Sequence, residues 1–140
     1  MKSFYSCIDA GLVVPQPIQH LAIRDKAQKA GGLVTFYGSE ESKTLKTQTF
    51  IKAKLQRSTG LDGVIFFSLH QFRYGPSFNF KLLRTILGLN LEVHFAREGV
   101  SILNAAQLDE LFPFLISVDY TTRRDQDPSW AQFLSKSKAL

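Results

Sequence analysis

The sequence has very little cysteine, with Cys7 as its single copy among 140 residues. One cysteine cannot form a disulfide within the chain, and it excludes zinc sites built from several thiolates. The three histidines lie on separate segments without the close spacing of a metal motif, so we expect no metal. No glycine-rich phosphate loop of the P-loop or dinucleotide-binding type is present, and we therefore expect no organic cofactor.

Long apolar runs are also missing. No stretch approaches the roughly 18 apolar residues of a membrane-spanning helix, and we expect no signal peptide in the N-terminal residues. We therefore expect a cytoplasmic protein with no membrane partner. The net charge of +5 is modest, so nucleic acid is not an expected partner from charge alone.

The composition supports a single folded core. Hydrophobic residues make up 44% of the chain, and 12 of the residues are phenylalanine. A chain of this size buries well over half of its unfolded surface. We predict one α/β domain over residues 1–120, followed at 121–140 by a polar linker and a short amphipathic helix.

Hydrophobic runs recur about every thirty residues, which is the rhythm of βαβ units. The expected strands are residues 3–8, 33–37, 63–69 and 91–96. The continuous apolar run at 64–67 is typical of a central strand that is covered on both faces. The pattern predicts a three-layer, doubly wound parallel sheet of four or five strands. The expected strand order is 2-1-3-4, as in flavodoxin-like and resolvase-like folds.

Helix signals separate these strands. A helix begins near Pro15 and ends at Gly31. The segment 44–59 favours a helix, although its alternation of apolar residues and lysines leaves an edge strand open. Ser77 or Asn79 can cap a third helix.

The last part of the chain is expected to be irregular. Asn104 can start a fourth helix, and Pro113 is expected to limit it to about two turns. Residues 115–120 are predicted as a fifth, edge strand. A polar linker at 121–127 then precedes a helix around Trp130, which can cover the core or contact another subunit.

In doubly wound sheets, ligands bind at the carboxyl ends of the strands. Polar side chains gather after the first, third and fourth expected strands, and Gln16 and Arg24 share one face of the first helix. His70 and Glu98 are the best acid and base candidates, because a histidine titrates near neutrality and burial can tune a carboxylate. Purely structural roles are open as well. Gln16 can solvate a helix start, and His94 can be a partly buried strand histidine whose hydrogen bonds are satisfied.

Two longer motifs, VIFFSLHQFRYG at 64–75 and VHFAREGVSI at 93–102, resemble the catalytic domain of resolvase-type serine recombinases over residues 2–112. In that family a serine after the first strand attacks a DNA phosphate, and arginines stabilise it. The corresponding segment here begins at Asp9 and has no serine, and His70, Gln71 and Tyr74 stand where arginines are expected. The resemblance therefore implies the fold without the phosphoryl-transfer residues.

A closer resemblance covers residues 4–103. The segments PQPIQHLAIRD at 15–25, FFSLHQ at 66–71 and HFARE at 94–98 resemble a small family found sporadically in bacterial gene clusters for lipopolysaccharide and other surface carbohydrates. His70 and Phe72 depart from its pattern. The resemblance implies unusual-sugar biosynthesis, with amides and arginines that suit sugar hydroxyls and an anionic substituent.

Together these observations predict a site for a sugar or a sugar phosphate. The expected catalytic residues are Glu98, His94 and His70, and the expected substrate-binding residues are Gln16, Gln19, Arg24, Ser68, Gln71 and Arg97. We expect an isomerase, epimerase or dehydratase in which Glu98 transfers protons with His94 or His70. The alternatives are a non-catalytic sugar-binding or partner subunit of another enzyme of the gene cluster, a homo-oligomer formed through the Trp130 helix, and a degenerate resolvase-like DNA-binding domain.

Overall fold

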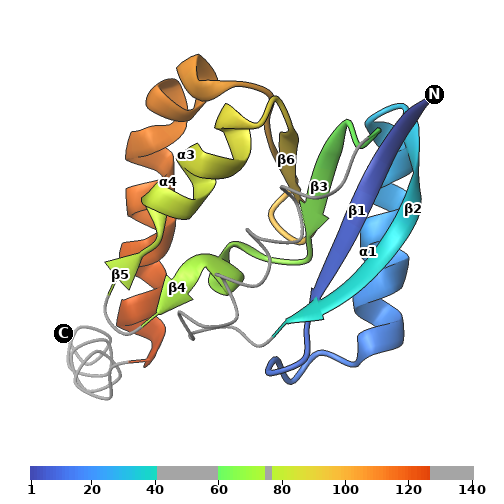
Figure 1. Ribbon diagram of the computed structural model, residues 1–140. Coiled ribbons are helices and arrows are strands. Elements are labelled where there is room, and N and C mark those ends of the chain that lie inside the picture. Colours follow the sequence, from blue (N-terminus) through green and yellow to red (C-terminus); the bar gives the residue numbers. More distant parts are fainter. Residues whose placement is uncertain (41–59, 75–76, 127–140) are drawn as a thin grey trace, which may run out of the picture. The chain divides into compact units, whose positions relative to one another are not determined.

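The computed structural model describes residues 1–40, 60–74 and 77–126 (Figure 1). The chain divides into two compact units, Met1–Leu108 and Asp109–Leu140. The segment 44–59 and the Trp130 helix lie outside the described residues. The described elements are β1 (Lys2–Asp9), α1 (Gln16–Lys29), β2 (Gly32–Glu40), β3 (Gly63–Phe66), the 3-10 helix η1 (Leu69–Phe72), β4 (Arg73–Tyr74), β5 (Ser77–Phe78), α3 (Phe80–Gly88), β6 (Glu92–Phe95), β7 (Val100–Ile102) and α4 (Ala105–Gln126).

Five of the strands form one sheet in the order β2-β1-β3-β6-β7. The pairs β1–β2, β1–β3 and β3–β6 are parallel, which confirms the predicted doubly wound α/β fold and its 2-1-3-4 order. The fifth strand, β7, pairs antiparallel with β6. The sequence did not reveal β7, because its three residues are too few to show a period of two. Gly99, with φ of 69°, allows the tight turn between β6 and β7.

The prediction of a fifth strand at 115–120 is wrong, because those residues belong to helix α4. Pro113 does not end the helix either, and the expected polar linker is helical as far as Gln126. Leu108 and Leu115 are both buried and lie seven residues apart, which is two turns of a helix. Burial at a helical spacing therefore favours a helix in this segment. The helix continues through Pro113 although proline has no N–H and one backbone hydrogen bond is missing there.

Alternate residues of the central strands face two separate layers. Ile8 in β1 and Ile65 in β3 pack with α1 in a cluster of fully or nearly buried residues, Phe4, Ile8, Ile23, Ala27, Ile65 and Phe67. On the opposite face, Phe66 and Phe95 stack at 5.8 Å, and both rings contact Phe72 of η1 edge to face. Phe72 is linked through Phe78 to Phe80, the first residue of α3. Helices α1 and α3 therefore cover opposite faces of the sheet.

The N-terminus of α3 is capped as expected at Asn79, whose Oδ1 accepts a hydrogen bond from the Leu82 amide at 3.0 Å. Asn104 likewise accepts from the Gln107 amide at 2.9 Å at the start of α4. In both helices the cap satisfies an amide that would otherwise lack a partner in the first turn. These local signals were readable in the sequence because each involves residues only three positions apart.

Candidate functional site

Gln19 fixes the loop that follows β1. Its side chain is completely buried, and its Oε1 accepts a hydrogen bond from the Asp9 amide at 2.8 Å. Its Nε2 donates to the carbonyl oxygens of Asp9 at 3.0 Å and of Val14 at 2.9 Å. The side-chain amide therefore joins the end of β1 to the residues that lead into α1. These backbone bonds use both polar atoms of the side chain, and no observation tests the predicted ligand-binding role of Gln19.

Gln71 does the same for the segment after β3. Its Oε1 accepts from the Ser68 amide at 3.0 Å, and its Nε2 donates to the Cys7 carbonyl at 3.1 Å. Gln71 is 6% exposed, and the bond to Cys7 spans 64 residues of sequence. The side chain thus ties η1 to β1.

Glu98 lies just beyond β6 and completes the connection between the strand ends. Its Oε2 accepts from Ser68 Oγ at 2.9 Å, and its Oε1 accepts from the Leu69 amide at 2.9 Å. Ser68 Oγ also accepts a hydrogen bond from the His70 amide at 3.2 Å. Ser68 is buried, whereas Glu98 is only partly buried. The carboxylate is therefore held in one orientation by η1.

The structure brings four predicted site residues to one edge of the sheet, namely Gln19, Ser68, Gln71 and Glu98. This edge is formed by the carboxyl ends of the parallel strands, where ligands bind in such sheets. His70, partly buried, and Arg97, exposed, belong to the same two loops. Glu98, His70 and Arg97 are thus the predicted residues at this edge that keep some exposed surface, while Gln19, Ser68 and Gln71 are buried.

His94 lies elsewhere, within the layer between the sheet and α1. It is 2% exposed, pairs in register with Ile65, and its ring meets Phe4 edge to face. Its Nδ1 lies 2.8 Å from Ser101 Oγ, and its Nε2 lies 3.0 Å from Glu92 Oε1. The structure does not place it with Glu98, which follows four residues later beyond the strand end. The alternative of a satisfied strand histidine describes His94 well.

The environment of His94 favours its neutral form. Burial is the largest influence and lowers the pKa of the imidazole below the usual 6.5. The hydrogen bond to Glu92 and the charge of that carboxylate act in the opposite direction, whereas Lys26 and Lys2 lower the pKa further. A neutral imidazole is held between one acceptor and one hydroxyl group.

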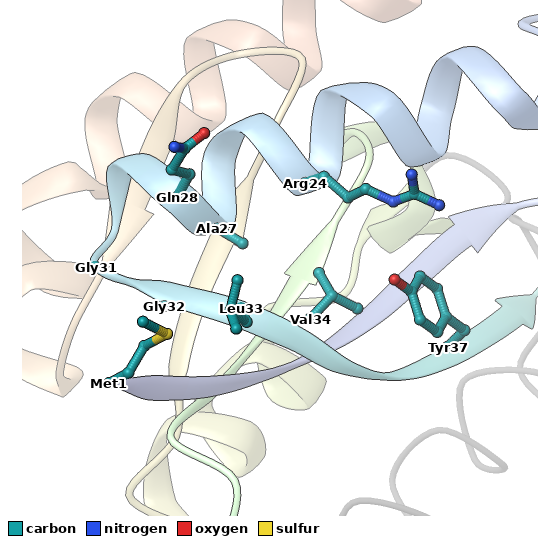
Figure 2. A pocket seen from close by; sticks show the side chains of 9 residues that line it. All are labelled: Met1, Arg24, Ala27, Gln28, Gly31, Gly32, Leu33, Val34 and Tyr37. Carbon is teal, nitrogen blue, oxygen red and sulfur yellow. The ribbon is translucent and has the colours of Figure 1, made fainter.

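Arg24 and Gln16 are exposed on α1 and are not part of the hydrogen-bonded series at the strand ends. Arg24 lines a pocket of about 580 Å³ between α1 and β2 (Figure 2). Figure 2 shows Arg24 and Tyr37 at one end of this pocket and Met1 at the other. The predicted residues therefore do not share one hollow, because α1 presents Arg24 to a different surface from the one that holds Glu98.

Within residues 1–40, 60–74 and 77–126, no three His, Cys, Asp or Glu side chains converge in a way that could hold a metal ion. Over the same residues, no helix has both the length and the apolar character needed to cross a membrane.

Comparison with known proteins gives a structural match. No protein-family model and no curated protein matches the sequence. The structure is similar to that of a resolvase family site-specific recombinase from Streptococcus pneumoniae, with a TM-score of 0.64, 9% sequence identity and 99% of each chain covered. The chain therefore has the resolvase-like α/β fold that its motifs predicted. At this identity the likeness shows the fold alone.

Proposed function

We propose that this chain is a cytoplasmic protein of bacterial surface-polysaccharide sugar biosynthesis that acts on a sugar or sugar phosphate through proton transfer by Glu98. The supporting observation is the Glu98 carboxylate itself. It is partly exposed at the carboxyl edge of the sheet and is oriented by Ser68 Oγ and the Leu69 amide, each at 2.9 Å. The reaction class is that of an isomerase, epimerase or dehydratase.

The geometry suits this chemistry in two ways. A carboxylate whose orientation is already fixed loses little conformational entropy when it contacts a reacting C–H or O–H group. Each of its oxygens can accept a second hydrogen bond, and sugar hydroxyls are suitable donors. The buried amides of Gln19 and Gln71 keep the surrounding loops in place without contacting the ligand.

Two neighbouring residues complete the proposed site. His70 follows Ser68 by two positions and carries a partly buried imidazole that can serve as the second proton carrier. Arg97 precedes Glu98, is exposed, and supplies a cation for an anionic substituent such as a phosphate. The choice of a carbohydrate rests on the resemblance of the segments 66–71 and 94–98 to the surface-polysaccharide family.

The test is proton exchange between a sugar and solvent. The full chain is incubated in D2O with a panel of hexose and pentose phosphates, and loss of a carbon-bound proton is followed by ¹H NMR. Glu98→Gln keeps the size of the side chain and should slow exchange by about 10²- to 10⁴-fold. Glu110→Gln is the matched control, because Glu110 is exposed on α4. Equal exchange by the wild-type protein and Glu98→Gln, in a protein whose circular dichroism is unchanged, refutes the proposed role.

DNA binding is a second candidate, favoured by the full-length structural similarity to a site-specific recombinase. Strand transfer is not part of this candidate, because the segment from the last residue of β1, Asp9, to Gly11 includes no serine. Binding of a labelled DNA duplex, measured by fluorescence anisotropy, should weaken steeply as salt rises from about 50 to 200 mM. No change in anisotropy at the low-salt end excludes this candidate.

A further inference from the structure

A second polar pocket lies at the opposite edge of the sheet, where β1 and β6 begin and α1 ends. Its volume is about 230 Å³. Its polar lining comes from four elements and comprises Lys2, Lys26, Lys29, Glu92, His94 and Ser101. Nothing in the proposed reaction at Glu98 uses these residues.

The lining carries an excess of positive charge. Three lysines and one glutamate line the pocket, and Asp25 pairs with Lys29 from outside the lining, so the local excess is one positive charge. Lys2 Nζ lies 2.6 Å from Glu92 Oε2, and Lys29 Nζ lies 2.9 Å from Asp25 Oδ2. For Lys26, no carboxylate lies within ion-pair distance among the residues that the structure describes. Burial, followed by the charge of Lys29, lowers the pKa of the Lys26 amine.

The base of the pocket is rigid. His94 is almost fully buried and is held by Ser101 Oγ at 2.8 Å and Glu92 Oε1 at 3.0 Å. Both Lys2 and Lys26 are close enough to act electrostatically on the ring. Lysines in the last turn also stabilise the dipole of α1. The dipole gives no reason, however, for Lys2, His94 and Ser101, from three different strands, to face the same pocket.

We propose that this pocket binds the phosphate group of a small phosphate monoester or of free phosphate, with Lys26 as its principal cation. The surroundings of the pocket are net positive, and lysine binds phosphate as a compact point charge. The volume equals that of about seven or eight waters at about 30 Å³ each, which accommodates a phosphate and a short carbon fragment but is smaller than typical cofactor pockets. Lys2 and Lys29 flank the anion.

The experiment is isothermal titration of the full chain with inorganic phosphate and with glycerol phosphate at a constant ionic strength of about 0.1 M. Lys26→Met keeps the aliphatic part of the side chain and should weaken binding at least about tenfold, which corresponds to about 1.4 kcal/mol. Lys81→Met is the matched control on α3, where Lys81 is exposed, and should bind within about twofold of wild type. Tighter binding of one of the two ligands identifies the source of the phosphate.

Three outcomes overturn the proposal. They are no binding of either ligand at millimolar concentration, equal losses in Lys26→Met and Lys81→Met, and equal affinity for dimethyl phosphate, which carries a single charge. The imidazole ¹H–¹⁵N signals of His94 should shift on phosphate binding, and unchanged signals would refute the location. Glu98→Gln should bind phosphate normally, so failure here and failure of the proposed activity at the other edge can be told apart.

Discussion

Replacing Gln19 by leucine tests whether the buried amide holds the β1–α1 loop. The substitution keeps a similar volume but removes three hydrogen bonds to the backbone, at 2.8, 3.0 and 2.9 Å. At about 1 kcal/mol net for each bond, the loss is about 3 kcal/mol. The Asp9 carbonyl keeps a second donor, the Leu12 amide at 3.3 Å, but the Asp9 amide and the Val14 carbonyl lose their bond to Gln19. Burial of the leucine offsets part of this loss, so we expect a decrease of about 2–3 kcal/mol in the free energy of unfolding.

Urea unfolding followed by circular dichroism measures this change. With a slope of about 1–3 kcal/mol per molar urea, a loss of this size should lower the midpoint by about 1 M or more. Gln28→Leu is the matched control, because Gln28 is exposed on the same helix and the substitution is identical. It should change the free energy of unfolding by less than about 0.5 kcal/mol.

The result that refutes this reasoning is a midpoint for Gln19→Leu that equals the midpoint for Gln28→Leu. Amide hydrogen exchange gives a second, local readout. The Asp9 amide should exchange faster in Gln19→Leu even under conditions where the whole chain remains folded, because its acceptor is gone. Unchanged protection of Asp9 would show that another acceptor replaces Gln19.

Two further predictions concern stability. Burial lowers the pKa of His94 below its unfolded value of about 6.5, so the unfolded chain binds the proton at a higher pH than the folded chain does. The free energy of unfolding should therefore fall as the pH drops below about 6.5, by at most about 1.4 kcal/mol per pH unit. His94→Gln should remove this dependence of the unfolding free energy on pH, measured by urea titrations between pH 7 and 5. Glu92, Lys2 and Lys26, which face the ring, are present in both proteins and contribute equally to both curves. An unchanged pH dependence in His94→Gln contradicts the assignment. Pro113→Ala should restore a helical hydrogen bond in α4 and raise the free energy of unfolding by up to about 3 kcal/mol. The thermal midpoint and the helical ellipticity should both increase, and a lower midpoint would show that the proline is favourable there.

Much of the fold was predictable because its signals are local or periodic. The apolar run at 64–67 identified the central strand, Pro15 and Gly31 bracketed α1, and Asn79 capped α3. Right-handed crossovers then restrict the strand order to very few solutions. Local rules failed at residues 115–120, where an edge strand was expected but burial at a helical spacing favours α4.

The candidate site was predictable at coarser detail. The rule that ligands bind at the carboxyl ends of parallel strands selected Ser68, Gln71 and Glu98, and the structure places them in one hydrogen-bonded series. It could not separate residues that support the loops from residues that face a ligand. That distinction depends on which backbone atoms lie within 3 Å of each side chain.

By itself, the order of residues determined the four parallel strands and their order, helices α1 and α3, and the edge at which polar side chains collect, because these follow from hydrophobic period, capping and chain chirality. Only the tertiary structure decided that Gln71 bonds to Cys7, 64 positions earlier, and that His94 shares a pocket with Lys2, 92 positions earlier. These long-range contacts depend on strand register and on which face of the sheet each helix covers. Both are set by the packing of the whole core.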